Sequence, residues 1–170
     1  EMYRGVVAAA DEGGVSLWVN GIDPGFANDW LPLVMTSVCE RIDEVRCMEI
    51  LNYATYDQPS VLFDIMGFGQ PMDEVPFILS PGILTTAWGS VVTQLAAGLD
   101  LTLDEIVEWH ERMPAPEAFD VASGRIEAGT TAAMRFEIRG VVGGETKVVV
   151  EHVTRLRDDQ GVIWYVPHGS

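Results

Sequence analysis

The sequence has 170 residues, of which 48% are hydrophobic, and carries a formal net charge of −16. This length and composition predict one folded domain with a substantial core and argue against an intrinsically disordered chain. The negative charge disfavours binding to nucleic acids or to anionic membranes, since both require a basic surface.

Two further features bound the class of protein. No run of about 18 apolar residues occurs, so no transmembrane helix is predicted. Cys39 and Cys47 are the only cysteines. We expect both to be buried free thiols of a cytoplasmic protein, because two cysteines at this spacing are too few for a structural zinc site and a disulfide is the less favoured alternative.

The N-terminal quarter is organised around one turn. Residues 2–12 predict a helix, which Gly13 and Gly14 end, and residues 15–19 predict a buried strand. The following Asp-Pro-Gly, residues 23–25, is typical of a tight turn, because proline fixes its own φ and glycine accepts a positive φ. The order strand, turn, helix places backbone N–H groups where α/β and α+β proteins often hold ligands. A plain connector with two core aromatics, Phe26 and Trp30, is the competing interpretation.

A helix is predicted over about 29–41, and a long strand follows. The helix is indicated by apolar residues at one-face spacing, namely Leu31, Val34, Met35, Val38 and Ile42. Residues 45–56 are apolar on both faces, as in a strand that is covered on both sides over part of its length. If the polar end of this strand approaches the turn, Asn52, Tyr53 and Tyr56 would form a pocket wall. Alternatively, Asn52 caps a turn and the tyrosines only pack their rings.

The middle of the sequence predicts two more helices. Residues 59–69 contain a short helical stripe that ends at Gly67-Phe68-Gly69, which lacks the spacing of a phosphate-binding loop. A long amphipathic helix is predicted over about 81–97, with Ser80 as its N-cap and Pro81 in its first turn. We expect this helix to lie on the sheet.

The C-terminal part predicts mainly strands. Residues 101–113 are ambiguous, and we favour a helical start, with Thr102 and Glu105 as a capping box, that passes into an extended stretch. Residues 119–123 are extended. Residues 132–142 and 146–156 form strands joined at Gly143-Gly144, with a bulge or longer loop near Gly140 that corrects the register. A last strand is predicted over 161–166.

The residues that carry chemistry are sparse. There is no nucleophile motif, no metal-binding spacing and no dinucleotide fingerprint, so we predict no metal site and assign no catalytic residue. His152 alternates within a strand and is interpreted as a sheet-face or core histidine, and His110 as a solvated one. The sequence does not define a role for either.

Several segments together resemble a known family. They are Gly21-x-x-Pro24-Gly25-Phe26 followed by Asp29 and Leu31-Pro32-Leu33, the Met66–Gly69 segment, and the glycine-rich hairpin. The chain resembles, from about Met2 to Leu156, the C-terminal domain of dihydrodipicolinate reductase-like proteins, which include 2,4-diaminopentanoate dehydrogenase and native amine dehydrogenases. Asp23 stands where this family usually has asparagine. The Lys and His-His pair expected for dihydrodipicolinate binding has no match.

The resemblance implies a fold and an activity. The fold would be α+β, a mixed and mostly antiparallel sheet with helices on one face and the other face serving a homodimer. The activity would be NAD- or NADP-dependent oxidation of an amine to an imine, which water then converts to a ketone. A Rossmann domain, with the catalytic glutamate, would lie upstream of a single substrate-binding and oligomerisation domain over residues 1–170, and both ends of the sequence suggest a piece of a longer protein.

The resemblance and the residue types together predict a cofactor- and substrate-binding site. Cofactor contacts are assigned to Asp23, Pro24 and Gly25, and the apolar substrate pocket to Phe26, Trp30, Asn52, Tyr56, Phe63, Met66 and Trp88. The alternative hypothesis is a non-enzymatic α+β module for small-ligand binding or dimerisation. The substrate and the choice between NAD and NADP do not follow from the sequence.

Overall fold

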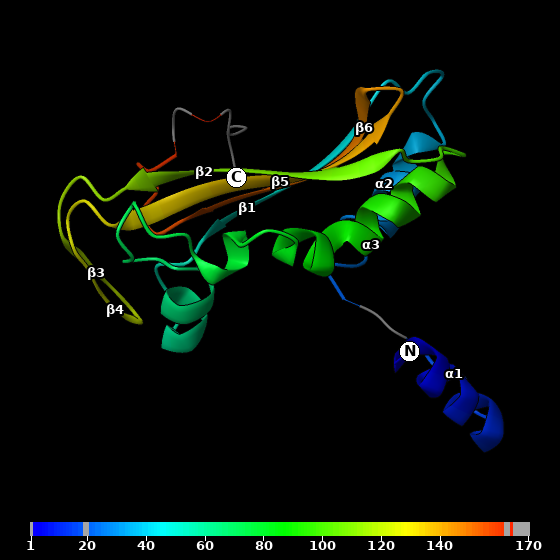
Figure 1. Cartoon of the computed structure of the whole chain (residues 1–170), viewed down its shortest axis with the longest axis horizontal. Coiled ribbons are helices and arrows are strands. Elements are labelled where there is room, and N and C mark those ends of the chain that lie inside the picture. Colours follow the sequence, from blue (N-terminus) through cyan, green and yellow to red (C-terminus); the bar gives the residue numbers. More distant parts are fainter. Residues whose placement is uncertain (1, 19–20, 162–163, 165–170) are drawn as a thin grey trace.

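The computed structural model describes residues 2–18, 21–161 and 164, and all structural statements concern these residues. Three α-helices and six strands are joined by two short helical turns (Figure 1). The helices are α1 (Met2–Gly13), α2 (Trp30–Thr36) and α3 (Ile83–Gly98), with a π-helical turn, η1 (Ser60–Ile65), and a 3-10 turn, η2 (Phe77–Leu79). The strands are β1 (Val45–Asn52), β2 (Glu105–Pro114), β3 (Phe119–Val121), β4 (Gly124–Ile126), β5 (Thr131–Val142) and β6 (Glu145–Arg155).

Four strands form the main sheet in the order β1-β6-β5-β2. β1 runs parallel to β6, whereas the β6-β5 and β5-β2 pairs are antiparallel. In Figure 1, α3 lies along one face of this sheet and α1 projects away from it. The predicted fold class, α+β with a mostly antiparallel mixed sheet and helices on one face, is therefore confirmed.

The β5-β6 hairpin sets the register of the sheet. Gly143 and Gly144 form its turn with φ values of 61° and 80°, which a glycine adopts without strain. The pairing shifts between Gly140 and Val141, so the predicted bulge is present. Ile138 consequently opposes Val150 on the face that α3 covers. A Cβ on Gly140 would lie only 2.8 Å from Val92 of α3, so glycine lets the helix approach β5 closely.

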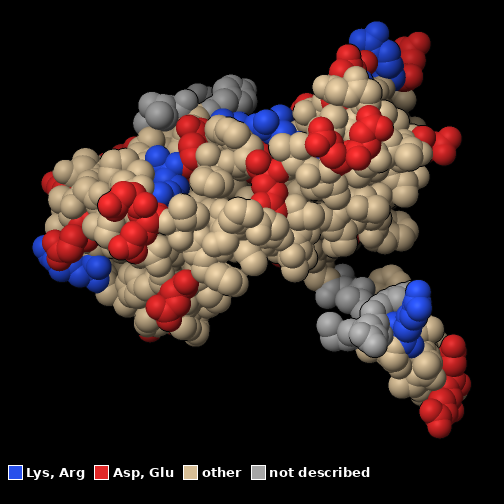
Figure 2. Space-filling model, viewed as in Figure 1, with Lys and Arg blue, Asp and Glu red and all other residues tan. Residues whose placement is uncertain are grey.

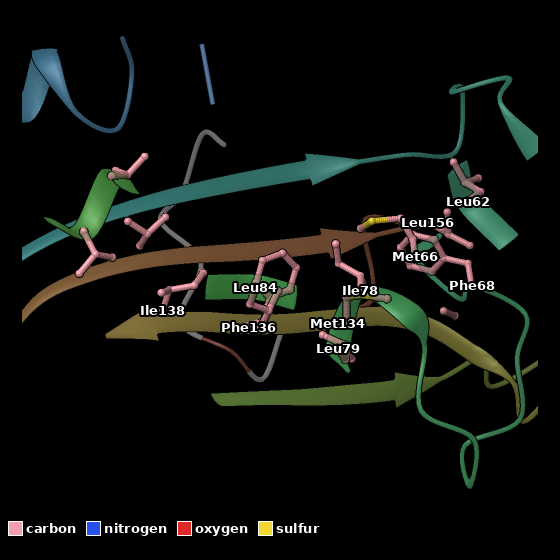
Figure 3. Close-up of a cluster of buried hydrophobic side chains, with 14 of the residues drawn as sticks. Leu62, Met66, Phe68, Ile78, Leu79, Leu84, Met134, Phe136, Ile138 and Leu156 are labelled. Atoms are coloured by element: carbon pink, nitrogen blue, oxygen red, sulfur yellow. The ribbon is translucent and has the colours of Figure 1, made fainter. Parts of the chain in front are cut away.

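The core fills the space between α3 and the sheet. Figure 3 shows Leu84 of α3 with Met134, Phe136 and Ile138 of β5, and all four are at most 1% exposed. Leu62, Met66, Phe68 and Leu156 gather toward the other end of the sheet in Figure 3, and Ile78 and Leu79 belong to the same buried cluster. Burying this much apolar surface supplies the main driving force for the fold.

The opposite face of the sheet carries an ion-pair network. Glu137 and Glu151 are nearly buried there, although both are charged side chains. Arg135 bonds both carboxylates, at 2.8 Å and 2.6 Å, and Arg46 and Arg139 complete the network. On the face that Figure 2 shows, acidic and basic residues are scattered among the other residues.

Several predicted elements differ from the structure. α2 is shorter than the predicted 29–41 helix and has no buried residue. Residues 15–18 form no strand and are exposed. Cys47 is half-buried, but Cys39 is exposed, which corrects the expectation for that thiol. None of the described helices is long and apolar enough to span a bilayer. Most of the predicted last strand, 161–166, lies outside the described residues.

Two further corrections concern α3 and β2. α3 begins at Ile83 after Gly82, whose φ is 84°, so the prediction of Ser80 as its N-cap was wrong. The carboxylate of Glu108 accepts the N–H groups of Gly82 and Thr85 and caps the helix from β2. Residues 101–104 are not helical and β2 is extended from Glu105, because pairing with β5 overrides the local helical pattern.

Candidate functional site

The turn between residues 21 and 28 is closed by its own backbone. The N–H of Phe26 donates to the carbonyl of Gly21 at 2.9 Å, and the N–H of Gly25 donates to the Asn28 side chain at 3.1 Å. The peptide bond before Pro24 is cis, and Gly25 has a φ of 144°. A Cβ at Gly25 would lie 2.3 Å from the Gly21 oxygen, so only glycine fits this position.

The turn directs the side chain of Asp23 into the protein. Its Oδ1 accepts the indole N–H of Trp88 in α3 at 2.7 Å and a short hydrogen bond from the Asn28 amide. Its Oδ2 lies 2.6 Å from Nε2 of His152 in β6. Burial alone would raise the pKa of Asp23, but the hydrogen bonds from His152, Glu49 and Trp88, together with the charge of His152, lower it to about 2. The carboxylate is therefore ionised.

Glu49 of β1 completes the cluster. In the parallel register, Glu49 stands opposite His152, and its Oε1 lies 3.9 Å from the same Nε2 that contacts Asp23. Burial, followed by the hydrogen bond and negative charge of Asp23, raises the pKa of Glu49 to about 8. At neutral pH, Glu49 is thus a neutral acid that can donate its proton to the Asp23 carboxylate.

The His152 ring is held from both sides. It stacks on Phe136 with a centroid separation of 4.8 Å and packs against Trp88 at 4.5 Å. Its side chain is 2% exposed, and Nδ1 has no hydrogen-bond partner among the described residues. Because an ionised carboxylate only accepts hydrogen bonds, Nε2 is the donor in the contact with Asp23.

Two cavities flank the turn. The larger, about 440 Å³, is lined by Trp18, Gly21, Pro24, Gly25, Phe26, Asp29, Trp30, Ser90, Val91 and Gln94. The smaller, about 130 Å³, is lined by Asp23, Ala27, Asn28, Cys47, Met48, Glu49, Val150 and Glu151. The larger volume is in the range of small-molecule sites, and its aromatic and glycine lining suits a planar ring.

The structure brings some of the predicted site residues together. Pro24, Gly25, Phe26 and Trp30 line the larger cavity, and Trp88 is bonded to Asp23. The Asp23 carboxylate faces the cluster, where donors from its own chain surround it. A cofactor contact at this turn would therefore be made by Pro24 and Gly25 more directly than by Asp23.

The other predicted site residues lie elsewhere in the described chain. Asn52 bonds Asp158 at 2.8 Å and the N–H of Ala54, and Tyr56 packs edge-on against Tyr53. Phe63 packs against the core near Gly69, and Met66 is buried in it. The part of β1 that meets the turn is Glu49 rather than the polar end of the strand.

Glu49 and Asn28 were not singled out in the sequence, and His152 was interpreted as structural. One signal was available, since Glu49 is an isolated acid within the otherwise apolar run 47–51. Such a buried acid requires a partner. The partner comes from β6, about 100 residues away, and only the sheet register identifies it.

The cluster also raises the question of a metal ion. Ligand atoms of Asp23, Glu49 and His152 lie within 4.8 Å of one another. However, both oxygens of Asp23 already accept hydrogen bonds, and Nε2 of His152 is engaged with Asp23. We therefore interpret the group as a hydrogen-bonded carboxyl–imidazole cluster and assign no metal to it.

The fold and this cluster define an α+β domain with one long helix on its sheet and a carboxyl–imidazole cluster beside two cavities. No protein-family model matches the sequence. The chain is 44% identical over 163 residues to an amine dehydrogenase of Streptomyces virginiae, covering 95% of this chain and 45% of that protein. It is 25% identical over 173 residues to a 2,4-diaminopentanoate dehydrogenase of Acetoanaerobium sticklandii, covering 94% of this chain and 46% of that protein.

A solved structure supports the same assignment of the fold. The structure of an amine dehydrogenase from Mycobacterium smegmatis matches with a TM-score of 0.60 at 17% identity, over 79% of this chain and 40% of that one. The two relatives support the resemblance to the amine dehydrogenase and 2,4-diaminopentanoate dehydrogenase family that the sequence predicted. The chain spans slightly less than half the length of the curated relatives that it matches.

Proposed function

We propose that this chain is the substrate-binding and oligomerisation domain of an NAD- or NADP-dependent oxidoreductase that acts on CH–NH₂ groups. The proposal rests on the 44% identity to an amine dehydrogenase over 95% of the chain, and on the two cavities that flank the turn at residues 21–28. The single structural observation that carries it is the Asp23 carboxylate, which is held by four groups from four parts of the chain.

The larger cavity is proposed to form the wall against which the nicotinamide ring of the coenzyme lies. Pro24 and Gly25 of the turn line it together with the aromatic residues Phe26 and Trp30. A bound nicotinamide coenzyme would accept the hydride that leaves the carbon bearing the amino group. The aromatic wall favours this step because it excludes water and helps to keep the amine neutral.

Exposed apolar residues support the presence of a second domain. Leu17, Trp18, Ile22, Phe26, Trp30, Leu31, Val34, Met35 and Val38 are all more than 40% exposed. They gather in the segment around the turn and α2, which borders a groove of about 770 Å³. A patch of this kind on a folded chain marks a covered interface. We propose that an upstream Rossmann domain, carrying the catalytic glutamate and most cofactor contacts, covers it.

The face of the sheet opposite α3 is proposed to form the homodimer. Trp109 lies there between the guanidinium groups of Arg135 and Arg139, each 5.3 Å from its ring. Arginine and tryptophan are enriched in the centres of protein interfaces. The two unpaired cysteines fit a reducing, cytoplasmic compartment.

The test uses the full-length natural protein. NADH and NADPH absorbance would be followed with ammonia and a panel of small ketones and aldehydes, and in reverse with the matching amines and 2,4-diaminopentanoate. We expect coenzyme oxidation that depends on ammonia and a ketone together. Coenzyme binding without turnover would contradict the proposed reaction on amines. Absence of coenzyme binding would favour a ligand-binding or dimerisation module instead.

A further inference from the structure

The larger cavity beside the turn has two walls of different chemical character. One wall is formed by residues of the segment 18–30, among them the aromatic residues Phe26 and Trp30. The other wall belongs to α3 and consists of Ser90, Val91 and Gln94. The hydrogen bond from Trp88 to Asp23 joins α3 to the turn two residues before Ser90. The two walls are therefore fixed relative to each other.

Helical spacing places the two polar residues of the α3 wall side by side. Ser90 and Gln94 are four positions apart, which brings their Cβ atoms to roughly 5–6 Å from each other on one face of the helix. Val91, which lines the cavity between them, is buried in the core. Ser90 and Gln94 themselves are exposed. The α3 wall thus offers a hydroxyl and an amide group beside an apolar surface.

Neither of these two side chains is engaged by the protein. The hydroxyls of Thr86 and Thr93 in the same helix donate to carbonyl groups four residues earlier, at 2.7 Å and 2.8 Å. This is the usual way in which a hydroxyl within a helix is satisfied. Ser90 forms no such bond, and the side chains of Ser90 and Gln94 have no hydrogen-bond partner among the described residues. Both are therefore available to a ligand.

Asp29, the charged residue that lines this cavity, differs in this respect. Its carboxylate accepts the N–H of Trp30 and caps the first turn of α2. Asp29 is therefore needed to hold the wall that carries the aromatic residues. Ser90 and Gln94 are the non-aromatic polar side chains of the lining that remain free to recognise a bound molecule.

We propose that Gln94 and Ser90 bind the carboxamide group of the nicotinamide ring of the coenzyme. The proposal rests on the proposed function, which assigns this cavity to that ring, and it names the residues that recognise the ring. A primary carboxamide carries one carbonyl oxygen and two N–H donors, as the side chain of Gln94 does, so the two groups match as a pair of reciprocal hydrogen bonds. The hydroxyl of Ser90 both donates and accepts, and it supplies a further bond to the same group.

This recognition predicts selectivity between two forms of the coenzyme. In reduced 3-acetylpyridine adenine dinucleotide, a methyl ketone replaces the carboxamide, so the carbonyl oxygen is kept and the N–H donors are lost. A site built to form hydrogen bonds to a group disfavours an analogue that lacks it, because the acceptor of the site is left without a partner. We expect the full-length protein to bind NADH about 10-fold more tightly than this analogue.

The experiment measures the Kd of NADH and of the analogue for the full-length protein by titration calorimetry, with NADPH and its own analogue used instead if that coenzyme binds more tightly. Gln94→Leu should weaken NADH binding about 10-fold and bind NADH and the analogue equally. Gln94→Glu keeps the size of the side chain and accepts the carboxamide N–H, but it cannot donate to the carbonyl oxygen. It should therefore prefer NADH over the analogue by more than the parent does. Ser90→Ala should weaken NADH binding about 3-fold.

The matched control is Gln58→Leu, the same change at an exposed residue that does not line the cavity, and it should alter neither Kd. Circular dichroism would verify that each variant is folded. An equal preference for NADH over the analogue in the parent, Gln94→Leu and Gln94→Glu would overturn the carboxamide contact and leave coenzyme binding standing. The expected preferences without turnover of any ketone with ammonia would support the contact and contradict the proposed reaction on amines. Absence of NADH and NADPH binding by the parent would overturn both.

Discussion

The indole N–H of Trp88 donates to Oδ1 of Asp23 at 2.7 Å and joins α3 to a turn 65 residues earlier in the chain. We expect Trp88→Phe to keep the ring packing against Phe136 and to remove this hydrogen bond. Because the acceptor is an ionised carboxylate, the loss should be about 1.5–3 kcal/mol of unfolding free energy. Chemical unfolding followed by circular dichroism measures it. Trp30→Phe, at a ring that is 58% exposed, is the control and should stay within about 0.5 kcal/mol of the parent.

The turn itself depends on Gly25. Gly25→Ala places a Cβ 2.3 Å from the Gly21 oxygen at a φ of 144°, so we expect a destabilisation of about 1–3 kcal/mol and a disturbed larger cavity. The matched control is Gly5→Ala in α1, where no atom lies within 4 Å of the new Cβ. That change should be neutral or stabilising by about 0.5–1 kcal/mol, because alanine favours helix. Equal effects of the two substitutions would contradict the assigned role of the turn.

The raised pKa of Glu49 predicts a specific pH dependence of stability. The folded protein holds this proton up to about pH 8, whereas the unfolded chain loses it near 4.5, so the contribution of Glu49 is fully present below 4.5 and declines as the pH rises to 8. The decline is at most about 1.4 kcal/mol per pH unit. The unfolding free energy should be measured for Glu49→Gln and the parent at pH 5, 6, 7 and 8. The value for the variant should increase relative to that of the parent as the pH rises. Parallel curves would show that Glu49 is not perturbed.

Asp23 acts in the opposite direction at low pH. Its pKa falls from 3.8 to about 2 on folding, so its contribution is present above 3.8 and is lost as the pH falls toward 2. We expect Asp23→Asn to reduce the acid sensitivity of unfolding in this window. It should also lower the pKa of Glu49, because the charge and hydrogen bond that help to raise it are removed. A pH titration of Glu49 by NMR measures the second effect, and an unchanged midpoint would argue against coupling of the two carboxyls.

The ion-pair network on the other face of the sheet should respond strongly to truncation. Glu151 is 1% exposed and bonds Arg46 and Arg135, so Glu151→Ala leaves two guanidinium groups short of a partner. We expect a loss of about 3–5 kcal/mol. Glu145→Ala removes an exposed pair with Lys147 and should cost no more than about 1 kcal/mol. Similar losses for the two variants would contradict the buried character of the network.

The sequence predicted those elements whose signal is local. The apolar helical pattern over 81–97 identified α3 to within two residues. The glycine pair predicted the β5-β6 hairpin, and the mismatch between the alternation of its two strands predicted the bulge at Gly140. β2 was partly missed because Thr102 and Glu105 resemble a capping box, and pairing with β5 decides that segment. Asp23 and Trp88 were both named, but their contact with each other and with Glu49 and His152 depends on sheet register and helix placement, which no local pattern specifies.

We propose that the full-length protein transfers hydride at a carbon that carries nitrogen. The direct measurement incubates the full-length protein with a ketone, ammonia and NADH or NADPH deuterated at the transferable position, and analyses the product by mass spectrometry. We predict an amine that carries one deuterium on the carbon next to nitrogen, formed only when ammonia is present. Formation of a deuterated alcohol irrespective of ammonia would contradict the account.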